Sequence, residues 1–240
     1  ILTDSAGHVF LSDTGNKRVR VYTASGEYLF DVGSGGNAPG QLNEPAGMAF
    51  HPDGRLFVAD TWNRRISVFN AADGTSMYQF PVLGWYEDLG NRPYLAVDPV
   101  RDLLYVTDPD AARVLVYTTG GTCIGSFGQK ITADAPLDNM SFVTIGGIAL
   151  DADGVVYVAD SSVNRILVFQ PFPLITSPNA DPALIEQLYG EPASSGEGSV
   201  EVTVEAGALT EEVTSEPPMV ESTVEITDES TVEATAEATP

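Results

Sequence analysis

One pattern recurs four times in the first 170 residues, and it limits the fold more than any other feature of the chain. In each copy an apolar run ends in an aspartate, and an arginine five residues later opens a second apolar run. The aspartates are 47, 48 and 52 residues apart. A period of this length indicates a repeat architecture, in which one supersecondary unit is copied along the chain. The aspartates are Asp13, Asp60, Asp108 and Asp160, and the arginines are Arg18, Arg65, Arg113 and Arg165.

Each copy is predicted to be a set of β-strands. Val, Ile, Phe and Tyr are concentrated in short runs bounded by Asp-Gly or Gly-Gly pairs, with no helical period. In the second copy we expect strands at residues 46–51, 55–60, 65–70 and 76–81. Asp-Gly pairs at 53–54 and 73–74 predict tight hairpins, because glycine accepts the positive φ that such turns require. Four short antiparallel strands per unit of about 47 residues are typical of a β-propeller blade.

Two segments carry a resemblance to a known family. The sequence from Leu56 to Ile66 and the linker from Gly40 to Ala49 closely resemble the NHL repeat of β-propeller proteins. The resemblance covers about residues 1–170 and is weakest in the third copy, where Pro109 follows the aspartate and Ala111 replaces an asparagine. It implies an all-β propeller built of four-stranded antiparallel blades, with four units visible in this chain.

The family typically has six blades, so the number of units leads to a further expectation. Aligning Gly7 with Gly54 sets Ile1 against Met48, inside what should be the innermost strand of a blade. We therefore expect a fragment that lacks about two blades, with the rest of the parent chain N-terminal to Ile1. Closure of four blades into a ring is the structural alternative, since propellers have about four to eight blades.

We interpret the repeated polar residues as structural and name no catalytic residue. A catalytic site needs one copy of a constellation, whereas these residues recur at the same place in every unit. A carboxylate at a strand end can accept turn N–H groups, and the arginine can return across the hairpin to pair with it. The structural set is Asp13, Asn16, Arg18, Asp60, Asn63, Arg65, Asp108, Arg113, Asp160, Asn164 and Arg165, with Asn164 one residue late in its unit.

Enzyme motifs find little support, and we expect no metal site and no cofactor. His8 and His51 have no Cys or His partners at metal-ligand spacing, and we interpret them as turn or surface residues. The acidic doublets at 108–110 and 151–153 do not continue into the spaced loop of an EF-hand. Gluconolactonase-like hydrolases, which hold a divalent metal in a six-bladed propeller, remain the alternative. Their metal ligands come from several blades and have no assigned counterparts here.

A recognition or scaffold role is the function that the resemblance favours. Members of the family bind proteins, and a few bind RNA, through the loops at one end of the propeller. Candidate contacts are Trp62, Arg64, Trp85 and Tyr86, because aromatic residues and arginine dominate interface energetics. In the competing interpretation, Trp62 covers a hairpin while Trp85 and Tyr86 fill the gap between two blades. The expected partner is a protein or a glycan.

Charge separates the chain into two parts and argues against nucleic acid as a partner. The formal net charge is −23, but residues 1–170 account for only −8, and the last 70 residues hold 15 acids and no base. An acidic chain repels phosphate backbones. We interpret the local basic cluster of Lys17, Arg18 and Arg20 as a solvated strand face.

The C-terminal part is predicted to be a linker followed by a disordered tail. Residues 171–190 are rich in proline, with a possible short helix at 183–189, and residues 191–240 consist largely of Thr, Glu, Val and Ala without aromatic residues. No apolar run is long enough for a transmembrane helix, and the single Cys123 cannot form an intrachain disulfide. Thr- and Pro-rich stretches of this kind occur in extracellular stalks, which favours an extracellular or cell-envelope location and leaves the cytoplasm open.

Overall fold

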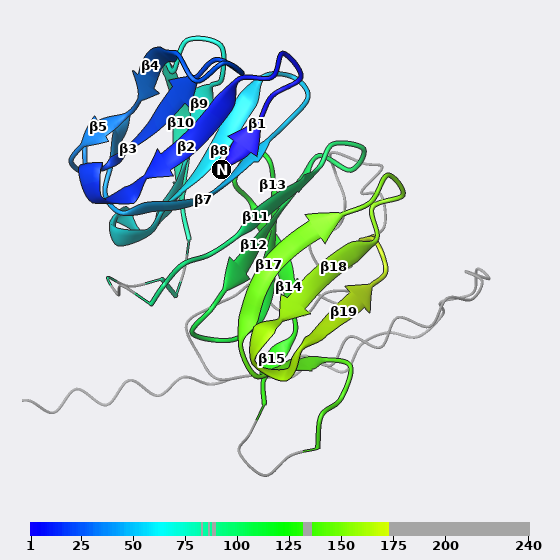
Figure 1. Ribbon diagram of the computed structural model, residues 1–240. Helices are drawn as coiled ribbons and strands as arrows, with labels where there is room; N and C mark the ends of the chain where they lie inside the picture. The colour runs from blue at the N-terminus through cyan, green and yellow to red at the C-terminus, as the bar shows by residue number, and fades with distance from the viewer. Residues whose placement is uncertain (83, 86, 88–89, 132–135, 173–240) are drawn as a thin grey trace, which may run out of the picture. The chain divides into compact units, whose positions relative to one another are not determined.

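The computed structural model describes residues 1–82, 84–85, 87, 90–131 and 136–172. Its regular secondary structure is all β, apart from three single-turn 3-10 helices. Four antiparallel sheets follow one another along the chain in the arrangement of four propeller blades (Figure 1). The predicted fold class is confirmed.

In blades 1 to 3, four strands pair in the order in which they occur in the sequence. Blade 1 consists of β1 (Leu2–Thr3), β2 (Val9–Asp13), β3 (Arg18–Tyr22) and β4 (Tyr28–Val32). Blade 2 consists of β7 (Pro45–Phe50), β8 (Arg55–Asp60), β9 (Arg65–Asn70) and β10 (Ser76–Pro81). Blade 3 consists of β11 (Leu95–Asp98), β12 (Leu103–Asp108), β13 (Arg113–Thr118) and β14 (Cys123–Phe127). The described strands of blade 4 are β17 (Ile145–Leu150), β18 (Val156–Asp160) and β19 (Arg165–Phe169).

Short parallel pairs lie in the linkers that enter blades 2 and 4. Strand β5 (Ser34–Gly35) pairs with β6 (Gln41–Leu42), and β15 (Gln129–Lys130) pairs with β16 (Ser141–Phe142). The 3-10 turns η1 (Thr14–Asn16), η2 (Thr61–Asn63) and η3 (Ser161–Val163) follow the signature aspartates in blades 1, 2 and 4. Blade 3 has no such helix in its described residues, in keeping with its different sequence at this turn.

The strands of blade 2 agree with the sequence prediction to within one residue at each end. Gly54 and Gly74 have φ values of +96° and +73°, so both hairpins use the left-handed backbone conformation that glycine accepts without strain. The same register, Asp paired with Arg across the hairpin, recurs in all four blades.

The hydrophobic core consists of three layers, one between each pair of neighbouring blades. Because side chains alternate across a strand, Leu56 and Val58 face blade 1 while Phe57 and Ala59 face blade 3. Both faces of blades 2 and 3 are covered in this way. The buried layers contain Phe10, Val19, Val21 and Val32 against blade 2, Ile66, Val68, Leu104 and Val106 between blades 2 and 3, and Tyr105, Val114, Val116 and Val156 between blades 3 and 4.

Several sequence predictions concern residues outside the described part of the chain. The predicted helix at 183–189 and the acidic tail at 191–240 lie there entirely, and of the linker at 171–190 only Pro171 and Phe172 are described. Phe172 packs between blades 3 and 4, with its ring centroid 6.0 Å from that of Tyr105. No helix within the described ranges has the length and hydrophobicity needed to cross a bilayer.

Candidate binding site

The Asp and Arg of the repeat form the same ion pair in every blade. The arginine Nε lies 2.7 Å from the aspartate Oδ2 in blade 2 and 3.0 Å from it in blades 1, 3 and 4. Each pair closes the hairpin between the second and third strands of its blade. The geometry is the one expected of a structural pair.

In blade 2 this pair also holds the linker that enters the blade. Asp60 is fully buried, and its Oδ1 accepts a hydrogen bond of 2.6 Å from the N–H of Asn43. The guanidinium of Arg65 donates to the linker carbonyls of Asn37, Ala38 and Gln41. Every strong polar group of the pair is therefore satisfied inside the scaffold, and no free carboxylate or base remains there for chemistry.

Blade 4 repeats this arrangement with different linker residues. Asp160 accepts hydrogen bonds from the N–H groups of Val143 and Thr144, and Arg165 donates to the carbonyls of Asp138 and Ser141. Asp60 and Asp160 therefore accept N–H groups of the incoming linker, not of the following turn as the sequence suggested, while the pairing with arginine across the hairpin is as expected.

The signature aspartates of blades 1 and 3 lie in different electrostatic surroundings. A hydrogen bond from Asn16, supported by Arg18, holds the pKa of the Asp13 carboxyl below its ordinary value. Burial raises the pKa of Asp108 above its ordinary value, although Arg113 opposes this shift. The pKa of the signature aspartate is therefore shifted in opposite directions in blades 1 and 3.

The signature asparagines fall into two groups. Asn16 and Asn63 donate to the aspartates of their own units, at 2.8 Å and 2.9–3.0 Å. Asn164 instead occupies the left-handed position at the end of its turn, with φ +53°, where the other blades have Lys17, Arg64 and Ala112. Asparagine tolerates this conformation better than most residues, which explains its one-residue displacement in the sequence.

The four candidate contact residues do not form one surface. Trp85 is only 4% exposed and packs in the core between blades 2 and 3, so it is not accessible to a partner and differs from the expectation. Its indole fills the gap between two blades, as in the competing interpretation. Trp62 is half-buried and Arg64 is exposed, and both belong to the η2 turn region of blade 2. Tyr86 lies outside the described residues.

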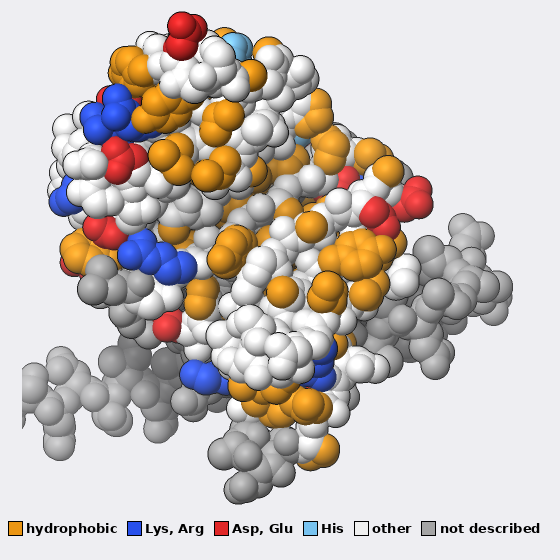
Figure 2. Space-filling model, viewed as in Figure 1, with side chains coloured by type: hydrophobic (Ala, Val, Ile, Leu, Met, Phe, Trp, Pro, Cys, Tyr) orange, Lys and Arg blue, Asp and Glu red, His pale blue; other side chains and the backbone are white. Residues whose placement is uncertain are grey.

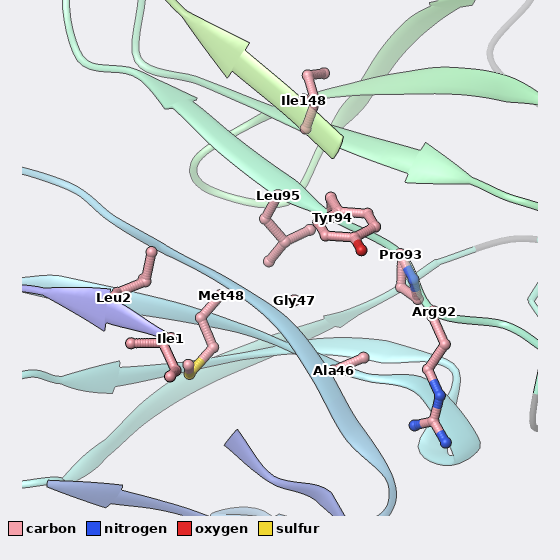
Figure 3. Close-up of a pocket in the computed structure, with 10 residues that line it drawn as sticks. All are labelled: Ile1, Leu2, Ala46, Gly47, Met48, Arg92, Pro93, Tyr94, Leu95 and Ile148. Atoms are coloured by element: carbon pink, nitrogen blue, oxygen red, sulfur yellow. The ribbon is translucent and has the colours of Figure 1, made fainter. Parts of the chain in front are cut away.

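A pocket of about 430 Å³ lies among the innermost strands of all four blades (Figure 3). We call it the inner-strand pocket. Most of its wall is apolar, and among the lining residues Arg92 has the only charged side chain. Pockets of this size and composition, apolar with a few polar groups, are typical of ligand sites. The lining residues are Ile1, Leu2, Ala46, Gly47, Met48, Arg92, Pro93, Tyr94, Leu95 and Ile148.

Arg92 connects this pocket to the η2 turn. Its Nη1 lies 3.4 Å from Oε2 of Glu44, and the backbone oxygen of Glu44 accepts a 2.6 Å hydrogen bond from the hydroxyl of Thr61. The N–H of the neighbouring Trp62 donates to Asn43. Glu44 itself has φ +52°, a conformation that costs energy for a residue other than glycine and that recurs at functional sites. The pocket rim and the exposed turn thus belong to one end of blade 2.

Sequence reasoning missed Arg92, Glu44 and Tyr94. Arg92 and Tyr94 lie in the segment that enters blade 3, which lacks the Gly-to-Pro linker pattern seen before blade 2. The available signal was that this segment, outside the strands, departs from the repeat. Residues that only build the scaffold recur from unit to unit, so a residue that does not recur is a candidate for another role.

The histidines lie near a second pocket, of about 600 Å³, formed by blades 1 and 2. The Nδ1 of His8 lies 2.8 Å from Asp4, and that of His51 lies 2.8 Å from Asp53, so each imidazole has a carboxylate partner in its own turn. Among the described residues, no group of three or more His, Cys, Asp or Glu is placed to hold a metal ion.

Together the sheets, the inner-strand pocket and the repeated ion pairs define the class of this protein as a β-propeller. The NHL repeat model matches residues 42–69 and 142–169, which are the second and fourth units. The chain thus carries NHL repeats within a propeller arrangement of blades, as the sequence resemblance indicated.

Similar solved structures include two lyases and a protein of unknown function. A streptogramin B lyase is 15% identical with a TM-score of 0.49, and the match covers 75% of this chain and 55% of that one. A catalytically inactive virginiamycin B lyase from Staphylococcus aureus, solved with quinupristin, is 17% identical with a TM-score of 0.49, covering 75% and 56%. A protein of unknown function from Bacteroides thetaiotaomicron is 24% identical with a TM-score of 0.49, covering 64% and 39%.

The chain thus spans about half the length of the lyases that it matches. No curated protein sequence matches it.

Proposed function

We propose that this propeller is a non-catalytic binding module that takes a protein partner at the end of blade 2. The observation that carries the proposal is the connection from the inner-strand pocket through Arg92 and Glu44 to the η2 turn. It combines an apolar cavity, an accessible cation and the exposed side chain of Arg64 in a single region.

The pocket suits an apolar side chain that is accompanied by a carboxylate. Leu2, Met48, Leu95 and Ile148 provide apolar walls, and Tyr94 is 49% exposed, so its ring is available for contact. Half-exposed aromatic residues of this kind are common in interfaces, since one end is apolar and the other accepts a hydrogen bond.

Arg92 is available to such a carboxylate. Its side chain is 45% exposed and its pairing with Glu44 is long, at 3.4 Å. The Glu44 side chain is only 14% exposed, so an incoming carboxylate shares the Arg92 guanidinium with Glu44 and does not replace it. A protein segment with an apolar residue beside an acidic one is therefore the ligand chemistry that we propose.

Selection of peptides from a displayed random library on the full 240-residue chain tests this function. We expect the enriched peptides to pair an apolar with an acidic residue, and Arg92→Ala to weaken their binding about tenfold or more, as loss of an interface arginine often does. Arg20→Ala, on blade 1 and outside the pocket, is the matched control. Enriched peptides that bind Arg92→Ala as well as the parent would contradict the proposal.

The hydrolase alternative makes a different prediction with the same protein. If the complete protein hydrolyses lactones in a calcium-dependent reaction, it is a metal-dependent enzyme and not the proposed binding module. The expected extracellular or envelope location stays a prediction, which fractionation of the producing cells tests.

A further inference from the structure

The junctions between neighbouring blades differ at the end that carries the hairpins between first and second strands. We name each junction by the two blades that it joins. The second pocket, of about 600 Å³, lies at junction 1–2, and we call it the hairpin pocket. Because the blades are copies of one repeat, the residues that line this pocket can be compared with their equivalents at the other junctions. Figure 2 shows that hydrophobic and charged side chains alternate over the surface of these blades.

At junction 2–3 a polar network crosses from one blade to the next. Nη1 of Arg55 donates to the hydroxyl of Tyr78 at 2.9 Å, and this hydroxyl donates to the carbonyl of Thr119 at 2.8 Å. Asp102 of blade 3 accepts hydrogen bonds from Nη2 of Arg55 and from the hydroxyl of Thr119. Hydrogen-bonded polar side chains therefore occupy this junction.

At junction 1–2 each of these four positions holds a smaller or less polar residue. The equivalence follows from shared backbone contacts, since the N–H of Ala71 donates to the carbonyl of Gly54 at 2.9 Å, as the N–H at position 119 does to the carbonyl at position 102. Without the larger side chains the junction is left open as the hairpin pocket. The replacements are His8 for Arg55, Phe30 for Tyr78, Gly54 for Asp102 and Ala71 for Thr119.

Junction 3–4 is filled in another way. Phe172, the equivalent of Ala72 in the hairpin pocket, packs between blades 3 and 4. A Cβ atom added at Gly154 would lie 2.1 Å from Nη1 of Arg101, whereas one added at the equivalent Gly54 would meet nothing within 4 Å. The open space at junction 1–2 is therefore a property of that junction and not of the repeat.

The hairpin pocket is apolar with a negative charge. Phe30 and Phe50 supply aromatic walls from blades 1 and 2, next to Pro52 and Ala71. Among the lining residues Asp4 has the only carboxylate, and none is a lysine or an arginine. Pockets of about 300–1,000 Å³ with this composition are typical of small-molecule sites. The charge favours a cationic ligand over an anionic one.

The polar groups that face a ligand are mainly hydrogen-bond acceptors. Oδ2 of Asp4 lies 2.8 Å from Nδ1 of His8, and Oδ1 accepts the backbone N–H of the same histidine. In a neutral imidazole, donation from Nδ1 to the carboxylate leaves Nε2 as an acceptor. The carbonyl of Ala71 is equivalent to the one that Tyr78 bonds at junction 2–3, but Phe30 has no hydroxyl to offer it. A ligand that donates hydrogen bonds therefore suits this pocket.

We propose that the hairpin pocket binds a small aromatic molecule that carries a protonated amine. The ring occupies the space beside the two phenylalanines, and the ammonium group donates to Nε2 of His8 and to the carbonyl of Ala71, near the charge of Asp4. The ligand thereby supplies the positive charge and the donor that Arg55 and Tyr78 supply at junction 2–3. This site is separate from the inner-strand pocket and does not depend on the proposed function.

NMR titration of the full chain with 2-phenylethylamine tests the proposal, with phenylacetate as the probe of opposite charge. We expect saturable binding of the amine, and binding of phenylacetate weaker by about tenfold or more, because the pocket has a carboxylate and no cation. The absence of saturable amine binding, or equal binding of the two probes, would overturn the proposal.

Variants at the pocket and at an equivalent position locate the amine. Ala72→Phe adds the side chain that fills junction 3–4, and should weaken binding of the amine about tenfold or more. Ser25→Phe adds the same ring at the equivalent position of blade 1, outside the hairpin pocket, and is the matched control. Arg92→Ala, in the inner-strand pocket, should have no effect. Amine binding that survives Ala72→Phe unchanged, or that Arg92→Ala abolishes, would contradict the proposal.

Two measurements do not depend on the folding of Ala72→Phe. In the parent chain, the imidazole signals of His8 should move as the amine is added, and unmoved signals would contradict the site. Asp4→Asn, which removes the charge and keeps an acceptor oxygen, should weaken binding of the amine more than binding of the uncharged 2-phenylethanol. Equal losses for the two probes would overturn the role of the charge.

Discussion

Blades 2 and 4 share the same sequence pattern, and both match the NHL repeat, but their surroundings differ. Within the described part of the chain, blade 2 is covered on both faces and blade 4 on one. Contacts within the blade and its linker, such as the Asp–Arg pair, are the same in both. Of these two blades, only blade 2 contacts a following blade among the residues that the structure describes. The repeat sequence therefore determines the contacts within each blade, while the neighbouring blades determine how much each residue contributes to stability.

The largest effect is expected where the two blades agree. Asp60→Ala should lower the free energy of unfolding by about 3–5 kcal/mol, because it leaves the charge of Arg65 without its buried partner. Asp160→Ala should cost less, since the Arg165 side chain is 20% exposed and that of Arg65 is 9% exposed. Chemical denaturation of both variants measures the difference. Unchanged stability of Asp60→Ala combined with loss of ligand binding would mean that the pair is functional and not structural.

The clearest contrast is expected from two isoleucines at equivalent positions. Ile66→Ala should cost about 2–4 kcal/mol because it leaves a cavity between blades 2 and 3. Ile166→Ala should change the stability of the monomer by no more than about 0.5 kcal/mol, since that side chain is largely in solvent. Chemical denaturation measures both losses. Equal losses would show that the Ile166 side chain is covered by something other than the described residues.

The equivalent glycines Gly47 and Gly147 test the same difference between blades 2 and 4, with smaller expected changes in stability. Gly47→Ala should cost about 1–3 kcal/mol, because the added methyl group overlaps the backbone at Pro93 and the strands must move apart. Gly147→Ala, with open space around it, should stay within about 0.5 kcal/mol of the parent. Thermal unfolding of the two variants is sufficient. A loss at Gly147 as large as that at Gly47 would contradict an open face.

The smallest effects concern the dependence of stability on pH through the signature aspartates of blades 1 and 3. Asp13 has a lowered pKa in the folded state, so its contribution to stability is present near neutral pH and is lost as the pH falls through that pKa. Asp108 has a raised pKa, so its contribution is present in acid and is lost as the pH rises through that value.

NMR titration of the carboxyl groups should therefore find Asp108 ionising at higher pH than Asp13. The Asp13→Asn and Asp108→Asn variants should shift the dependence of unfolding free energy on pH in opposite directions. Titration of Asp13 above Asp108 would contradict the assigned environments.

The strands, the hairpins and the Asp–Arg pair of each blade could be predicted from the sequence because they depend on local signals. Asp-Gly pairs fix the hairpins, alternation fixes the strand faces, and the Asp–Arg spacing fixes the pair across the turn. The accessibility of Trp85 could not be predicted, since an indole in a linker looks the same whether it meets a partner or a neighbouring blade. Asn164 was displaced by one residue for a backbone reason that only its φ value reveals.

The candidate site was the least predictable part. Arg92 and Glu44 are 48 residues apart, and they meet because two linkers converge on the innermost strands. The exposure of Ile166 and Val168 in β19 was equally unpredictable, because these residues are of the types expected in a buried strand. Only comparison with the covered blades shows that these side chains are exposed. The six-blade count stays a prediction.

The hydrogen bonds that Arg65 and Arg165 donate to the incoming linkers have a mechanical consequence. The segments that enter blades 2 and 4 are each bound to the blade that they enter, so tension on the chain acts on the interface between blades before it acts on the hairpins within them. We expect the array to unfold under tension in steps of a whole blade.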